Sequence, residues 1–174
     1  MQFRSLSLTR RMAAVLVAVL AVAAAPACGD SKSDKAIELG EIPISHVPAE
    51  LLGMKLEAEK SAEIVKATES QPFVEEIGLF SMRRDELLQA TLQIARFSPE
   101  AKLDERRFRD NIAEQISNSK PQVLRMGKEL VYMSASQKQA LVVWFKDRTM
   151  FVLAMREEFP QPRALLREAL EIKP

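Results

Sequence analysis

The sequence predicts an α+β domain in which two or three helices pack on a mostly antiparallel sheet of five or six strands. Residues 87–97 alternate between apolar and polar side chains, as in a strand with one buried face. Two apolar segments, residues 139–146 and 149–156, are separated by only two residues, which indicates a hairpin. Apolar residues recur with the helical period in residues 104–117 and after Pro162.

Composition supports a single folded domain, which we place at residues 42–174. The 174-residue chain is 47% hydrophobic and 28% charged, with five glycines and nine prolines. Its first 27 residues hold three arginines and no acid, so the remaining 147 residues carry 22 basic and 24 acidic side chains, net −2. Because this charge balance lacks a basic surplus, we expect no nucleic-acid partner.

The beginning of the domain has no clean period. Pro48-Ala49-Glu50-Leu51-Leu52 is predicted to form a helical turn that ends at Gly53. Ser61 is predicted to cap a helix that runs through Thr68, and Pro72 ends it.

Two strands with a short turn follow. Residues 74–82 are predicted as the first strand, residues 83–85 as the turn and residues 87–97 as the second strand. In the second strand Ala90, Leu92 and Ile94 share one face and Gln89, Thr91 and Gln93 the other, so one face is expected to be buried.

A helix follows the second strand. Ser98-Pro99-Glu100 has the chemistry of a helix start, and the regular helix is predicted over residues 104–117. Phe108, Ile112 and Ile116 lie on its buried face, and Asn118-Ser119-Lys120-Pro121 ends it.

Three or four further strands and a last helix complete the domain, depending on whether Gly127 forms a bulge within one strand or a tight turn between two. Residues 123–126 and 129–134 flank Gly127, and residues 139–146 and 149–156 flank Asp147-Arg148, whose second residue is expected to need a positive φ. The last two strands are apolar on both faces and should be central. The helix that begins at Pro162 should lie on the sheet just before it, through a stripe formed by Leu165, Leu166, Ala169 and Leu170.

The first 27 residues have the pattern of a secretory signal peptide. Arg4, Arg10 and Arg11 precede an apolar run over residues 13–25, and small residues follow. A helical run of that length is about 20 Å long, against a hydrocarbon core of about 30 Å, so it is too short to span a membrane. We therefore expect export.

Cys28 is the predicted site of lipid attachment. Cleavage is expected between Ala27 and Cys28, and Cys28 is the only cysteine of the chain. The preceding Ala25-Pro26-Ala27 resembles a bacterial lipobox, although Ala25 and Pro26 depart from it. Ordinary secretion of a soluble protein is the alternative. Acylation would anchor the protein on the extracytoplasmic face of the cell membrane. Residues 28–41 then form a tether about 20 Å long, which predicts a membrane-proximal partner.

Most catalytic and metal chemistry has no candidate residues. The one histidine, His46, has no motif around it, and His and Cys are too few for a zinc site. Phosphate-binding loops need clustered glycines, and the nearest two here are 11 positions apart. We expect no catalytic residue, no metal and no cofactor.

Three residue sets keep a functional alternative open. An acid-pair hydrolase could use Glu75-Glu76, Asp104-Glu105 or Glu157-Glu158, although adjacent strand residues point to opposite faces. A basic surface for lipid headgroups could use arginines of two helices, although acids are interleaved with them: Arg106, Arg107, Arg109, Arg163 and Arg167. Methionines could form a binding surface, although core filling is the commoner role: Met126, Met133, Met150 and Met155.

Several short segments follow one another in a recognisable order. They include Gly78-Leu79-Phe80, Leu87-Leu88-Gln89-Ala90-Thr91-Leu92-Gln93, Arg107-Phe108-Arg109, Val131-Tyr132-Met133, Val143-Trp144-Phe145, Phe151-Val152-Leu153 and Pro162-Arg163-Ala164-Leu165-Leu166. The order resembles uncharacterised exported lipoproteins of actinobacterial type, and the element order is similar to the PsbP/Mog1-like α+β fold. That resemblance implies a domain that binds a protein or a small molecule without catalysis, and it assigns no functional residue.

The predicted function is therefore that of a non-enzymatic, membrane-anchored extracytoplasmic domain that binds a protein partner or a small ligand. An acid-pair hydrolase of the cell envelope and a structural component of an envelope assembly are the alternatives.

Overall fold

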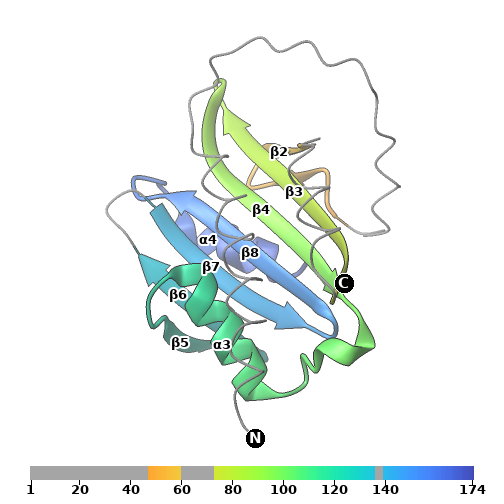
Figure 1. Cartoon of the computed structure of the whole chain (residues 1–174). Coiled ribbons are helices and arrows are strands. Elements are labelled where there is room, and N and C mark those ends of the chain that lie inside the picture. Colours follow the sequence, from red (N-terminus) through yellow and green to blue (C-terminus); the bar gives the residue numbers. More distant parts are fainter. Residues whose placement is uncertain (1–46, 60–72, 136–138) are drawn as a thin grey trace, which may run out of the picture.

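A computed structural model describes residues 47–59, 73–135 and 139–174. In this part of the chain eight strands form one antiparallel sheet, and two α-helices and one 3-10 turn accompany it (Figure 1). The strands are β1 (Glu50–Leu51), β2 (Met54–Ala58), β3 (Val74–Arg84), β4 (Leu87–Phe97), β5 (Gln122–Met126), β6 (Glu129–Ala135), β7 (Gln139–Lys146) and β8 (Thr149–Arg156). The helical elements are η1 (Pro99–Ala101), α3 (Arg106–Ser117) and α4 (Pro162–Ala169).

The strand order is β1-β2-β3-β4-β8-β7-β6-β5, which is two four-stranded meanders placed side by side. They join where β4 pairs with β8, from Ala90 opposite Met155 to Arg96 opposite Thr149. The connection from β4 to β5 contains η1 and α3, so it carries the chain from the middle of the sheet to its outer edge.

The two α-helices cover opposite faces of the sheet. In Figure 1, α3 lies in front of β6 and β7, and α4 lies behind β7 and β8. Alternate residues of each central strand serve the two faces. Val143 packs in the core on the α3 side, whereas Val142 and Trp144 pack in the core on the α4 side.

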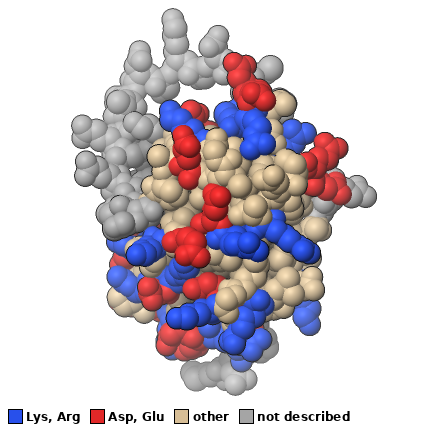
Figure 2. Space-filling view, turned by 180° about the vertical axis from the view of Figure 1, so that it is seen from behind, with Lys and Arg blue, Asp and Glu red and all other residues tan. Residues whose placement is uncertain are grey.

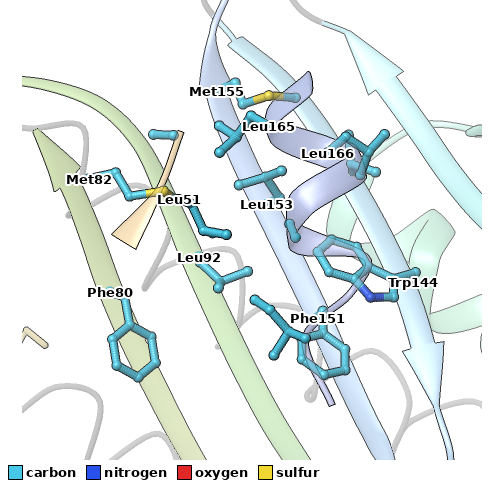
Figure 3. Packing of buried hydrophobic residues seen from close by; sticks show 14 of the residues in the cluster. Leu51, Phe80, Met82, Leu92, Trp144, Phe151, Leu153, Met155, Leu165 and Leu166 are labelled. Carbon is cyan, nitrogen blue, oxygen red and sulfur yellow. The ribbon is translucent and has the colours of Figure 1, made fainter. Parts of the chain in front are cut away.

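The core on the α4 side buries the largest aromatic group of the chain. The Trp144 ring is stacked on Phe151 with centroids 5.1 Å apart. Leu165 and Leu166 of α4 point toward the sheet in Figure 3, and Leu165 is completely buried. Full burial of one such side chain contributes about 1.5–3 kcal/mol to folding, which explains why the short helix stays on the sheet.

The six predicted strands are present, as are the predicted central position of β7 and β8 and the site of the last helix on the sheet before it. The sheet is larger than predicted because β1 and β2 extend it. The helical turn predicted over residues 48–52 is wrong. Leu51 and Met54 are instead buried in the core on the α4 side, and Leu52 and Gly53 form a two-residue hairpin with φ of 49° and 67°. The helix predicted over residues 61–68 lies outside the described residues.

Two turns differ from their predictions in detail. β3 extends to Arg84, so the turn consists of Asp85 and Glu86, with φ of 51° and 65°, rather than of residues 83–85. The connection between β7 and β8 has two residues as predicted, but the positive φ of 49° belongs to Asp147 and not to Arg148. Strand twist favours such left-handed turns even where glycine is missing.

The helix-start chemistry at Ser98 leads to a 3-10 turn, and α3 begins only at Arg106. Ser98 makes no side-chain capping bond. A hydrogen bond from its side chain, together with the backbone N–H of Glu100, instead holds the pKa of the Glu100 carboxyl below its usual value.

Candidate functional site

The outer edge of the sheet at β5 is the strongest candidate for a functional surface. In the described sheet β5 is a terminal strand with β6 as its one neighbour. Val123 and Leu124 are 40% and 37% exposed, and Leu87 is the other large hydrophobic residue exposed among those described. The strand thus presents apolar side chains together with a backbone edge that no described strand covers.

The register of the β5–β6 hairpin shows which backbone groups point outward. Met126 pairs with Glu129 across the two-residue turn at Gly127 and Lys128, and such a closing pair exchanges both hydrogen bonds. Bonded and non-bonded pairs alternate, so Leu124 bonds to Val131. The N–H and C=O groups of Val123 and Arg125 therefore point away from β6, toward the open edge.

Positive charge surrounds this edge. Lys120, Arg125 and Lys128 are all exposed, and none forms an ion pair with a described residue. Several exposed basic residues elsewhere are neutralised, for example Lys102 by Glu105 and Arg106 by Asp110. The β5 edge is consequently a short basic strip with no described counter-charge.

A hydrogen bond holds the sheet beside this edge to α3. The Tyr132 hydroxyl donates to Asp110 Oδ1 at 2.7 Å, and Tyr132 packs edge-on against Phe145. Burial, and then the Asp110 carboxylate, raise the pKa of Tyr132 to about 12. Tyr132 is opposite Val123, so α3 is fixed to the strand that supports β5.

A second unusual feature is a buried polar row on β3 and β4. Ser81 is opposite Thr91, and Gln93 is flanked by Leu79 and Val152 on the neighbouring strands. Gln93 is 0% exposed, and neither its amide nitrogen nor its amide oxygen has a hydrogen-bond partner; the Ser81 hydroxyl also lacks one. The prediction that β4 has one buried face is therefore wrong, because Thr91 and Gln93 are buried as well.

Among the described residues, the predicted carboxylate pairs are not brought together into one acid-pair site. Glu75 pairs with Arg148 and Glu76 with Arg96, each at 3.7 Å, so each acid has a different arginine as its partner. Asp104-Glu105 lies before α3, and Glu157-Glu158 lies after β8, with all four side chains exposed. No group of three or more His, Cys, Asp or Glu residues in the described ranges could hold a metal ion.

The five helical arginines do not make one basic surface. Arg106, Arg107 and Arg109 belong to α3 and Arg163 and Arg167 to α4, on opposite faces of the sheet. Figure 2 shows the face behind that of Figure 1, where positive and negative side chains are interspersed with uncharged surface. The methionines serve the core, since Met150 and Met155 are buried and Met126 and Met133 pack against the α4-side cluster.

The predicted processing and lipid site, Ala27 and Cys28, lies outside the described residues, and so does His46. Within the described ranges, no helix is long and apolar enough to cross a membrane.

Comparison with known proteins found no matching family model, no matching curated protein and no matching solved structure. The resemblance to exported lipoproteins and to the PsbP/Mog1-like fold therefore stays a prediction.

The sequence pattern predicts β5 as a strand but does not by its periodicity mark it as an edge strand. A usable signal was present, because Pro121 precedes the strand and Lys120 and Lys128 flank it, and proline and lysine are typical of edge strands. The buried polar row left no such signal. Alternation of apolar and polar residues looks the same whether the polar face is wet or covered.

Proposed function

We propose that this protein is a membrane-anchored, non-enzymatic extracytoplasmic domain that binds a partner protein at the edge formed by β5. The observation that carries the proposal is the exposure of Val123 and Leu124 on a strand with an open backbone edge. A sheet edge that exposes hydrophobic side chains can accept a strand from another chain. Pro121, Lys120 and Lys128 flank this edge, as is typical of edge strands, and they leave Val123 and Leu124 exposed.

The predicted signal peptide and the lipid-attachment site at Cys28 support a location at the membrane surface. With a lipid at Cys28 and a tether about 20 Å long, the domain works beside the membrane surface. A lipid-bound partner, or the external part of a membrane protein, is within reach. An acid-pair hydrolase gains no support from Glu75 and Glu76, because each is paired with a different arginine.

Binding of a small ligand is the second candidate, and Gln93 is the observation that favours it. A buried amide without partners costs about 1–3 kcal/mol, and a ligand that bonds to it would recover that cost. The β5 edge favours the first candidate, because it combines apolar, polar and charged groups on one accessible strand.

Cell fractionation tests the anchoring. We expect the wild-type protein in the membrane fraction and the Cys28→Ala variant in the soluble fraction, because only the former receives acyl chains. Ser31→Ala in the same tether is the matched control and should stay in the membrane fraction. A wild-type protein found in the medium, or a free thiol at Cys28 by mass spectrometry, would contradict the anchoring.

Site-specific cross-linking in intact cells tests the binding. A photoreactive residue at position 124 should give a discrete protein adduct, and one at position 87 should not, although Leu87 is 59% exposed. The adduct should weaken in the Cys28→Ala background, which removes the protein from the membrane surface. Equal labelling from both positions would show that exposure alone, and not a binding edge, explains the adduct.

A further inference from the structure

We infer that the partner is an extended acidic segment of another protein, which adds to the sheet as a further strand beside β5. This inference deepens the proposed function, since it specifies the chemistry of the partner that the edge would take. It depends on the backbone groups, charges and side-chain faces of residues 120–128.

The backbone of β5 is prepared to accept one more strand. The N–H and C=O groups of Val123 and Arg125 point outward, while those of Leu124 bond to β6. An incoming antiparallel strand could form bonded pairs with both outward residues. These bonds would supply sequence-independent affinity, and the side chains would supply specificity.

The exposed basic residues at β5 determine which partner strands fit this edge. Lys120, Arg125 and Lys128 are exposed without described ion-pair partners, and the nearest acid in sequence is Glu129, which is partly buried. Opposite charges across a strand pair contribute about 0.2–1 kcal/mol each, and like charges oppose pairing by similar amounts. An acidic strand therefore fits this edge, and a basic one does not.

The same charges disfavour a second copy of this chain. Antiparallel self-pairing about Leu124 places Lys120 of each copy opposite Lys128 of the other. A register shifted by one residue toward the turn places Arg125 opposite Arg125. The opposite shift places Pro121, which has no N–H, opposite the outward groups of Arg125.

The two faces of β5 indicate the order of acidic and apolar residues expected in the partner strand. Val123 and Arg125 lie on the face of Tyr132, the α3 side, and Leu124 lies on the face of Val131, the α4 side. A partner with acids on the α3 side and apolar residues on the α4 side would pair with Arg125 and cover Leu124 in one placement.

Binding of a defined peptide tests the inference. The full chain is purified in detergent and titrated with a labelled, end-capped peptide of alternating Glu and Val, and then with the matching Lys and Val peptide. We expect the acidic peptide to bind about tenfold more tightly at low salt and to lose affinity as salt is added. Equal binding of the two peptides would overturn the inference.

Hydrogen exchange locates the bound peptide without any mutation. The amides of Val123 and Arg125 should exchange rapidly in the free protein and become protected on binding, whereas that of Leu124 should be protected throughout. Binding without protection at Val123 and Arg125 would place the peptide elsewhere and overturn the inference. Protection that rises with protein concentration in the absence of peptide would show a second copy to be the occupant, with the same consequence.

Variants provide a separate test of the charge and of the backbone. Arg125→Glu combined with Lys128→Glu should reverse the peptide preference, and Arg163→Glu on α4 should leave it unchanged. Val123→Pro should abolish binding, because it removes an outward N–H that β6 does not use. If Val123→Pro fails to fold, an acidic peptide with N-methyl groups along one edge replaces it and should not bind.

Failure of the acidic-strand inference can be distinguished from failure of the proposed function. Loss of membrane association in the wild type would reject the anchor and leave the peptide experiment unaffected. Failure of the acidic peptide, together with a retained adduct at position 124 in cells, would reject the acidic strand and leave partner binding in place.

Discussion

Gln93 is in an environment that does not match its chemistry. Its amide could make several hydrogen bonds, yet it is fully buried between Leu79 and Val152 without a partner for either amide atom. Ser81, one strand away, is in the same condition. Such groups weaken folding by the cost of removing them from water.

Replacement of Gln93 by methionine should therefore stabilise the protein. Gln93→Met keeps the length of the side chain and removes both unpaired polar atoms, and we expect the free energy of unfolding to rise by about 1–3 kcal/mol. Urea denaturation of the full chain measures this change. Gln93→Glu is the control and should be strongly destabilising. A methionine variant less stable than the wild type would mean that the amide is hydrogen-bonded in solution.

Because of Tyr132, the free energy of unfolding is expected to vary with pH in the alkaline range. Because its folded pKa, about 12, is higher than the ordinary value of 10, the neutral phenol is favoured in the folded state. That contribution is complete below pH 10 and is lost as the pH rises from 10 through 12. The chain has one tyrosine, so tyrosinate absorbance follows this residue alone.

Tyr132→Phe should remove this loss between pH 10 and 12 and should cost about 1 kcal/mol at neutral pH through the missing hydrogen bond to Asp110. Unfolding free energies measured across that pH range for both proteins test the assignment. An equal alkaline loss in Tyr132→Phe would show that another group is responsible.

At the scale of elements, hairpins dominate the molecule and their turns carry strain. Asp85 and Glu86 both adopt the left-handed conformation, which costs a residue with a side chain about 1–2 kcal/mol. The β3–β4 pairing on either side fixes this turn, from Arg84 opposite Leu87 to Val74 opposite Phe97.

Glu86→Gly should stabilise the β3–β4 hairpin by up to about 1 kcal/mol, after the entropy that glycine adds to the unfolded chain is subtracted. Thermal or urea unfolding measures the gain. Glu157→Gly is the matched control, because Glu157 is also an exposed turn residue but lacks a positive φ. A loss of stability at both positions would show that the turn at Glu86 is not strained.

Elements with a strong period were predictable from sequence, and those that depend on distant partners were not. Trp144 and Phe151 lie in strands with two apolar faces, so their central position follows from local pattern. β1 has two residues and exists because Leu51 packs in a core completed by α4, over 110 positions later. The edge position of β5 likewise follows from the chain order of the sheet, which local periodicity does not encode.

At the scale of the whole molecule, the sheet lies between two cores formed by the described residues. Tyr132 belongs to the core on the α3 side and Trp144 to the core on the α4 side. They lie on adjacent strands, with Tyr132 opposite Val143 and Trp144 opposite Val131. Loss of either core would remove one face of the same strands, so we expect the two cores to unfold together.

Two intrinsic probes can check this cooperativity, because the chain has one tryptophan and one tyrosine. Urea transitions followed by Trp144 fluorescence and by a Tyr132 near-ultraviolet signal should have the same midpoint and slope. Far-ultraviolet circular dichroism should follow both. Separate midpoints would mean that α3 or α4 detaches before the sheet is lost.

The pairing of β4 with β8 has a consequence for how the chain acquires its structure. β4 ends at Phe97 and β8 begins at Thr149, so the edge of β4 that pairs with β8 has no partner until more than 50 further residues have been synthesised. Closure of a loop this long is slow, and meanwhile an apolar strand remains available for wrong associations. A nascent chain interrupted before Thr149 should therefore aggregate, and a holding chaperone should be needed until the last hairpin emerges.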